Sequence, residues 1–143
     1  MPIMYGLKEK TDNVKNDTGG KILMGNTPEE LLELVVRTAD DRQAKDIIAI
    51  DMREISILTD YNVIAHASNK RLINAIADSI VEAATKAGIE VKSIEGKQSR
   101  DWILIDLGDV IFHVFDEEER SRYRLESLWT EAPTVDITDW MNE

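Results

Sequence analysis

The chain has 143 residues, of which 28 are acidic and 17 are basic, giving a formal net charge of -11. This charge argues against direct binding of DNA or RNA phosphates across a broad surface, and it favours a basic protein partner. The chain has no cysteine, which excludes disulfides, cysteine-ligated zinc and thiol catalysis. We find neither a bilayer-spanning run nor a signal-peptide pattern, so we expect a cytoplasmic protein with no membrane partner.

Residues 1–26 differ from the rest of the chain. They hold four of the seven glycines and show no sustained hydrophobic period, which predicts a disordered N-terminal tail. The codons for Thr18-Gly19-Gly20 can contain a ribosome-binding sequence, and Met24 follows shortly afterwards. We therefore expect translation to start at Met24, with residues 1–23 as upstream leader. Residues added in cloning and a genuine disordered arm are the alternatives.

An ordered domain is expected from residue 27 to residue 130. Thr27 and Glu30 form a capping-box pattern with Pro28 at the first helical position. The helix that follows has apolar residues at i, i+3, i+4 and i+7: Leu32, Val35, Val36 and Ala39. Residues 46–51 and 61–66 read as buried strands.

The second half of the domain continues this alternation of helices and strands. Ser68 or Asn69 is expected to cap a long helix that ends at Gly88. Residues 89–94 read as a weaker strand near a sheet edge, and residues 116–129 as a last helical segment. Residues 131–143 form an acidic C-terminal tail. With the hairpin described next, these elements predict one α/β domain with a mixed five-stranded sheet flanked by helices.

Residues 101–115 are the most informative passage, because two apolar runs flank a Leu-Gly-Asp turn and predict a β-hairpin. Side chains alternate along a strand, so Trp102, Leu104 and Asp106 share one face, while Ile103 and Ile105 share the other. The second face is suited to a core. The first combines an aromatic ring with a carboxylate, which is typical of a surface that recognises a basic partner.

Several carboxylates and histidines could instead indicate catalysis or a metal site: Asp51, Asp60, His66, Asp106, Asp109 and His113. Metal sites of this composition need three convergent ligands, and the hairpin supplies two at most. We favour a structural interpretation, in which Asp106 and Asp109 bond the turn backbone and His113 is a hydrogen-bonded, half-buried residue. No Gly-rich phosphate loop and no nucleophile elbow is present, so we expect no enzyme, no cofactor and no metal.

The chain resembles the ribosomal silencing factor (Iojap) family from about Thr27 to Pro133. The residues that carry the resemblance are Asp40-Asp41, Ala44, Asp46-Ile47, Asp51, Asp60-Tyr61, Val63-Ile64, Arg71, Ala75-Ile76-Ala77-Asp78, Glu95-Gly96, Trp102, Asp106, Gly108-Asp109-Val110, His113-Val114-Phe115, Arg120, Tyr123, Leu125-Glu126 and Leu128-Trp129. The chain departs from the family at His66-Ala67 and Asn69, where members usually have Thr-Gly and Ser, and at Asn62, where they usually have Phe.

The resemblance implies a nucleotidyltransferase-like fold without the catalytic residues. It also implies a homodimer when free and binding to the large ribosomal subunit through its fourteenth protein, uL14. Docked there, the family blocks joining of the small subunit and lowers translation when nutrients are scarce. The partner-binding residues implied are Trp102, Asp106, Leu107 and Asp109. The alternative is a residual nucleotide-binding or nucleotidyltransferase enzyme that uses Asp51, Asp106 or Asp109 with magnesium.

Overall fold

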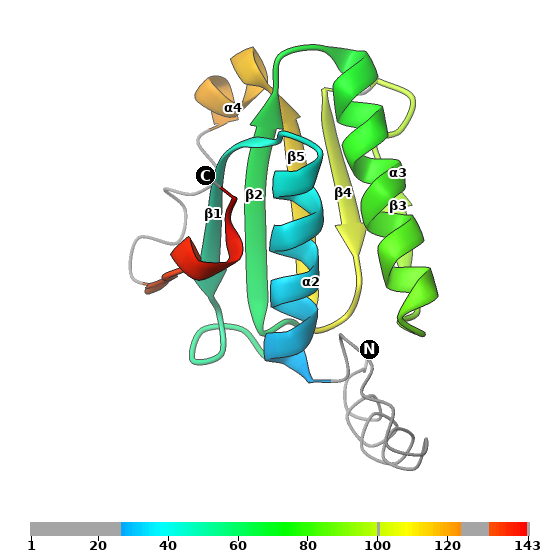
Figure 1. Ribbon diagram of the computed structural model, residues 1–143. Helices are drawn as coiled ribbons and strands as arrows, with labels where there is room; N and C mark the ends of the chain where they lie inside the picture. The colour runs from blue at the N-terminus through cyan, green and yellow to red at the C-terminus, as the bar shows by residue number, and fades with distance from the viewer. Residues whose placement is uncertain (1–26, 100, 124–131, 143) are drawn as a thin grey trace.

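The part of the chain that the structure describes forms a six-stranded mixed sheet with helices packed on one face (Figure 1). The computed structural model describes residues 27–99, 101–123 and 132–142. The strand order is β3-β4-β5-β2-β1-β6. The strands are β1 (Lys45–Asp51), β2 (Tyr61–Ala67), β3 (Ser93–Glu95), β4 (Trp102–Asp106), β5 (Val110–Asp116) and β6 (Thr134–Val135). The helices are α2 (Pro28–Asp41), α3 (Lys70–Lys86), α4 (Glu117–Tyr123) and the short 3-10 helix η3 (Thr138–Trp140).

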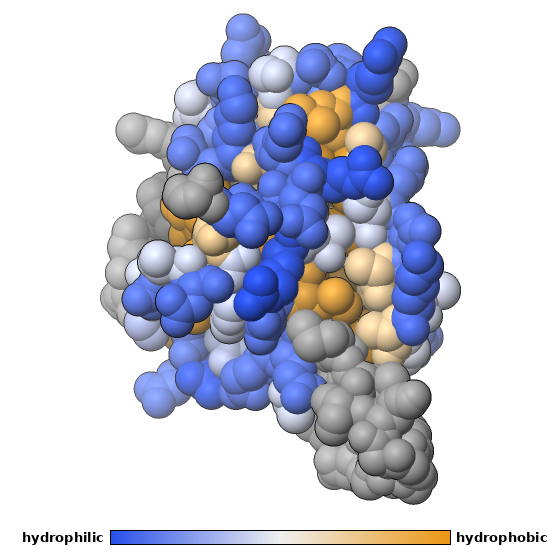
Figure 2. All heavy atoms as spheres, in the orientation of Figure 1, coloured by the Kyte–Doolittle hydropathy of each residue, from blue (hydrophilic) through white to orange (hydrophobic). Residues whose placement is uncertain are grey.

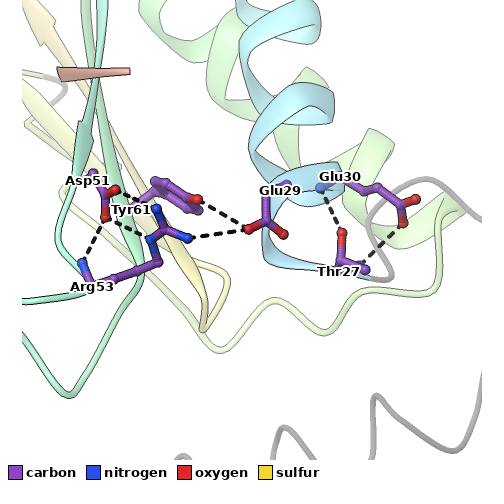
Figure 3. A network of polar contacts seen from close by, with 6 residues as sticks. All are labelled: Thr27, Glu29, Glu30, Asp51, Arg53 and Tyr61. Carbon is purple, nitrogen blue, oxygen red and sulfur yellow. Dashed lines mark hydrogen bonds and ion pairs between the residues drawn. The ribbon is translucent and has the colours of Figure 1, made fainter. Parts of the chain in front are cut away.

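Local capping decides where the two long helices begin. Thr27 accepts a hydrogen bond from the Glu30 backbone at 3.0 Å, and the Glu30 side chain accepts one from the Thr27 backbone at 3.3 Å (Figure 3). This reciprocal pair satisfies two backbone donors that the first turn of α2 leaves free. At α3 the Asn69 side chain accepts from the Leu72 backbone at 2.8 Å. Both caps confirm the sequence prediction, and Asn69 rather than Ser68 is the cap of α3.

The directions of the strands bring three chain segments to one end of the sheet. β2 and β5 run parallel, whereas the β1–β2, β3–β4, β4–β5 and β1–β6 pairs are antiparallel. The β1–β2 loop, the β4–β5 turn and the start of α2 therefore lie together at the lower end in Figure 1. This end, called here the hairpin end, carries the turn that the sequence singled out.

The two faces of the sheet have different coverings among the described residues. α2 and α3 pack on one face over a core that includes Val63, Ile103 and Phe112, each fully buried. Seen from the helix side, hydrophilic side chains dominate the surface, and apolar groups show in patches between them (Figure 2). On the opposite face, called here the open face, a smaller cluster joins Ile50, Met52, Ile64 and Phe115, with Trp102 packed against it.

The sheet has one strand more than the five that the sequence predicts, which corrects that expectation. The additional strand is β6, and it comes from the segment interpreted as an acidic tail. β6 pairs with β1 at Ala49–Val135 and Ile50–Thr134, and η3 follows it. A two-residue strand carries no periodicity of its own, so a sequence pattern has no signal for it. The mixed α/β fold itself is confirmed.

The bounds of β3 and α4 differ from the ranges that the sequence predicts for them. The strand expected over residues 89–94 is shorter and shifted toward the C-terminus, at Ser93–Glu95, and it begins opposite Asp106, the last residue of its partner strand β4. The helix expected over residues 116–129 is described as α4 up to Tyr123. Its continuation over 124–129, and the expected tail of residues 1–26, lie outside the described residues.

Candidate partner-binding surface

Trp102 begins β4 and lies on the open face, as the strand alternation predicts. Its indole stacks on the Phe115 ring, with centroids 4.8 Å apart and planes 23° from parallel. The residue is half-buried, so one side of the ring packs on the sheet and part of it faces outward. An amphipathic ring held in this way is the kind of side chain that anchors protein interfaces.

A buried histidine fixes the orientation of the Trp102 ring. The Trp102 Nε1–H donates to His113 Nδ1 at 3.2 Å, and His113 Nε2 lies 3.1 Å from Asn62 Oδ1. Because the indole can only donate, Nδ1 must accept, so the Nε2 proton of a neutral His113 is donated to Asn62. His113 is 5% exposed, and this burial lowers its pKa to about 4. The imidazole is therefore neutral at physiological pH and keeps its acceptor for Trp102.

The β4–β5 turn uses Asp106 to fix its own backbone. Asp106 Oδ1 accepts from the Gly108 backbone at 2.8 Å, and the Leu107 N–H donates to the Val110 carbonyl at 2.9 Å. Gly108 has a φ of 90°, a conformation that glycine adopts without strain. The structural role expected of Asp106 is confirmed. Its half-buried side chain still lies at the surface of the open face.

Asp109 and Leu107 occupy different environments. The Asp109 side chain is half-buried, and its carbonyl accepts from Thr59 Oγ1 and from the backbones of Asp60 and Tyr61 at 2.9–3.0 Å. These bonds attach the turn to the β1–β2 loop. Leu107 is 4% exposed and packs in the core beneath the helices. The interpretation of Leu107 as a partner contact is therefore corrected, since a buried side chain offers no surface to a partner.

Two of the sequence-predicted residues, Trp102 and Asp106, share the open face but are not adjacent. Trp102 and Asp106 stand at the two ends of β4, about 13 Å apart at about 3.3 Å per residue. Leu104 lies between them on the same face, and Ile111 on β5 is the register partner of Asp106. All of these side chains are half-buried. The open face thus presents a strip with an aromatic residue at one end, aliphatic residues in the middle and carboxylates at the hairpin end.

An arginine that sequence reasoning missed organises the hairpin end (Figure 3). Arg53 donates to both oxygens of Asp51, at 2.9 and 2.7 Å, and its Nη1 lies 3.5 Å from Glu29 Oε2. Its guanidinium also lies 5.4 Å from the Tyr61 ring centroid. The hydrogen bonds from Arg53 lower the pKa of Asp51. Asp51, a candidate magnesium ligand in the alternative interpretation, therefore has a cation partner within the protein.

A second missed cluster lies at the opposite end of the sheet. Arg120 on α4 is 7% exposed and donates to the Asp46 carbonyl at 2.7 Å and to His66 Nδ1 at 3.0 Å. Asp46 has a φ of 50°, within an irregular stretch of β1 between Lys45 and Ile48. Burial and the adjacent Arg120 charge lower the pKa of His66. The hydrogen bonds of Arg120 attach α4 to this irregular stretch of β1, so we assign the cluster a structural role. The sequence gives no spacing signal for it, because its members come from three elements.

The candidate metal ligands do not converge within the described part of the chain. No group of three histidine or carboxylate side chains there is arranged to hold a metal ion. Of the carboxylates considered, Asp51 is paired with Arg53 and Asp106 with the turn backbone. None of the helices in these residues has the length and apolar character that a membrane span needs.

A family model and individual relatives of this chain point to the same protein family. A family model described as "Ribosomal silencing factor during starvation" matches residues 25–143. A protein named ribosomal silencing factor RsfS from Bacillus subtilis is 43% identical over 113 residues, which cover 79% of this chain and 96% of that protein. A mouse protein named "Mitochondrial assembly of ribosomal large subunit protein 1" is 31% identical over 69% of this chain and 45% of its own length.

Solved structures agree with this match. A crystal structure of a protein from Bacillus halodurans superimposes with a TM-score of 0.69 at 42% identity, covering 76% of this chain and 98% of that one. A crystal structure of a protein from Chromobacterium violaceum gives a TM-score of 0.71 at 31% identity, covering 73% and 87%. Both similarities extend over most of the domain, so they support the mixed sheet as well as the family.

Proposed function

Because this chain belongs to the ribosomal silencing factor (RsfS) family, we propose that it binds the large ribosomal subunit and represses translation without catalysing a reaction. The name of the family describes silencing during starvation, and the name of the mouse relative refers to the large subunit. We propose further that the contact is with uL14, as the family resemblance implies. The docked protein then blocks joining of the small subunit by its bulk.

The observation that carries this proposal is the half-buried Trp102 on the open face of an acidic protein. Trp102 is oriented by His113 and supported by Phe115, so binding does not have to order its ring. The carboxylates at the hairpin end complement a basic ribosomal protein. We propose that the free protein is a cytoplasmic homodimer, as the family resemblance implies.

Replacing Trp102 tests this proposal. We expect Trp102→Ala to weaken binding to large subunits by at least about 2 kcal/mol, roughly thirty-fold, because an interface anchor is lost. Trp102→Phe keeps an aromatic ring stacked on Phe115 but removes the rest of the indole. Weaker binding by this variant with an unchanged melting temperature therefore shows that the indole contacts the partner and is not needed only for packing on the sheet. The measurements are co-sedimentation with large subunits, subunit joining followed by light scattering, and melting temperature.

The expected pattern links occupancy to inhibition. Subunit joining should recover in proportion to lost binding, because steric exclusion requires only an occupied site. The proposal is contradicted if the wild-type protein does not co-sediment with large subunits. It also fails if a folded Trp102→Phe variant binds at full occupancy but no longer blocks joining, since inhibition would then need more than bulk.

A further inference from the structure

The β1–β2 loop exposes a group of large aliphatic side chains. Ile55 is 48% exposed, Ile57 92% and Leu58 67%. They are three of the four large hydrophobic residues that are exposed among the described residues, and they lie within four positions of the chain. Single exposed aliphatic residues are common, but a local group is typical of an interaction site.

The loop presents these side chains on a hydrogen-bonded backbone. The Met52 carbonyl accepts from the backbones of Ile55 and Ser56, at 2.9 and 2.8 Å. The Leu58 backbone donates to Ser56 Oγ at 3.0 Å. These bonds close two successive turns, so the backbone holds Ile57 and Leu58 outward. Because the loop is already ordered, binding of a partner to these side chains would cost little conformational entropy.

Both ends of the loop are attached to the hairpin end of the sheet. At one end Arg53 joins Asp51 to Glu29 on α2 (Figure 3). At the other, Thr59 and Asp60 donate to the Asp109 carbonyl at 3.0 and 2.9 Å. The end of the loop that follows Leu58 is therefore bonded directly to the turn that carries Asp106 and Asp109.

The charges around the loop narrow the choice of partner. Residues 51–60 contain three acidic side chains and one basic one, Arg53, which is paired with Asp51 and Glu29. A second copy of the chain would bring the same acidic patch against itself in a two-fold interface. A phosphate backbone would be repelled as well. A protein surface with an apolar pocket surrounded by lysine and arginine fits both features.

The geometry points to the β1–β2 loop as a second contact element, in which Ile57 and Leu58 insert into an apolar pocket on a basic protein of the large subunit. This inference rests on the proposed function, and it specifies a second part of the protein that contacts the ribosomal partner. The open face and the loop then form one surface around the hairpin end. Apolar anchors inside a rim of charged residues are the usual composition of a protein interface.

A double substitution with a matched control tests the loop. We expect Ile57→Ala with Leu58→Ala to weaken binding to large subunits at least about tenfold, with the melting temperature unchanged, since neither side chain is buried. Ile94→Ala on β3 removes another exposed aliphatic side chain, 39% exposed, at an edge of the sheet. It should change binding less than about twofold.

The outcomes separate this inference from the proposed function. Failure of the wild-type protein to bind large subunits overturns the proposed function. Wild-type binding together with equally tight binding of the double variant overturns the loop contact alone. A photo-reactive p-benzoylphenylalanine at position 57 supplies an independent measurement: cross-linking to a basic protein of the large subunit is expected, whereas cross-linking only to ribosomal RNA or to a second copy of the chain contradicts the inference.

Discussion

At the scale of single residues, the arrangement of Trp102, His113 and Asn62 is the most specific feature of the open face. Each hydrogen bond determines the next, because the indole proton sets the imidazole tautomer and the imidazole then donates to Asn62. Asn62 is 3% exposed, so its amide oxygen is buried together with the imidazole. In this chain the buried imidazole proton therefore has a side-chain acceptor, which avoids the cost of burying it unpaired.

The lowered pKa of His113 predicts a pH-dependent stability. An unfolded histidine has a pKa near 6.5, whereas burial lowers that of His113 to about 4. The unfolded state therefore binds more protons in this window, and stability falls as the pH drops from about 6.5 to about 4. The full loss is about 3 kcal/mol. Denaturant unfolding at a series of pH values measures it.

A His113→Gln variant supplies the control for that prediction. Glutamine offers an acceptor to Trp102 and does not titrate, whereas the other ionisable groups are unchanged. The difference in free energy of unfolding between wild type and variant should therefore shrink as the pH falls through this window. A difference that stays constant between pH 7 and pH 4 would show that His113 does not titrate as its burial requires.

At the scale of elements, the C-terminal segment closes one edge of the sheet. β6 pairs with β1, and the Pro133 carbonyl accepts from the Asp51 backbone at 2.8 Å. Beyond it, Trp140 and Met141 pack against the core, and the Asn142 backbone donates to Asp40 on α2 at 2.7 Å. The segment thus covers the outer side of β1, which would otherwise present unpaired backbone groups.

Removal of this segment should destabilise the domain. We expect a chain that ends at residue 131 to lose at least about 2 kcal/mol of unfolding free energy, because edge hydrogen bonds and apolar packing are lost together. Asn142→Ala, which removes only the side-chain bond to Asp41, should cost about 1 kcal/mol or less. Thermal and urea unfolding compare the two, and equal stability of truncated and complete chains would contradict the role of β6.

At the scale of the whole molecule, the net charge of -11 should control how fast the protein meets its partner. Electrostatic attraction to a basic surface raises the association rate, and salt screens it over about 8 Å at physiological ionic strength. Apolar anchors act chiefly on dissociation. The carboxylates of the hairpin end and the aliphatic residues of the β1–β2 loop should therefore have separable kinetic effects.

We expect potassium chloride, at constant magnesium, to slow association with large subunits while dissociation changes little. Asp106→Asn with Asp109→Asn should reduce this salt dependence, because two charges facing the partner are lost. Asp78→Asn with Glu82→Gln makes the same charge change on α3, on the helix side of the sheet, and should have a smaller effect. Kinetics on immobilised large subunits measure these rates, and equal slopes for both double variants would contradict the assignment.

Particular residues show where prediction from sequence succeeds. The capping box at Thr27 and the alternation along residues 102–106 are local patterns, and both appear in the structure as predicted. The family resemblance also predicts the fold, because the residues that carry it are distributed over the whole domain. Leu107 shows the limit. A turn residue looks accessible in sequence, but whether its side chain points outward or into the core depends on the elements packed beneath the turn.

The sequence by itself determined the helix starts, the hairpin, the acidic balance and the family, because each depends on residue types at fixed spacings. Only the tertiary structure decided that β6 completes the sheet, that Arg53 joins Asp51 to Glu29, and that the β1–β2 loop lies against the hairpin turn. Except for the local Arg53–Asp51 pair, these contacts join residues far apart in the chain. Their partners are selected by packing and strand register, which no local pattern encodes.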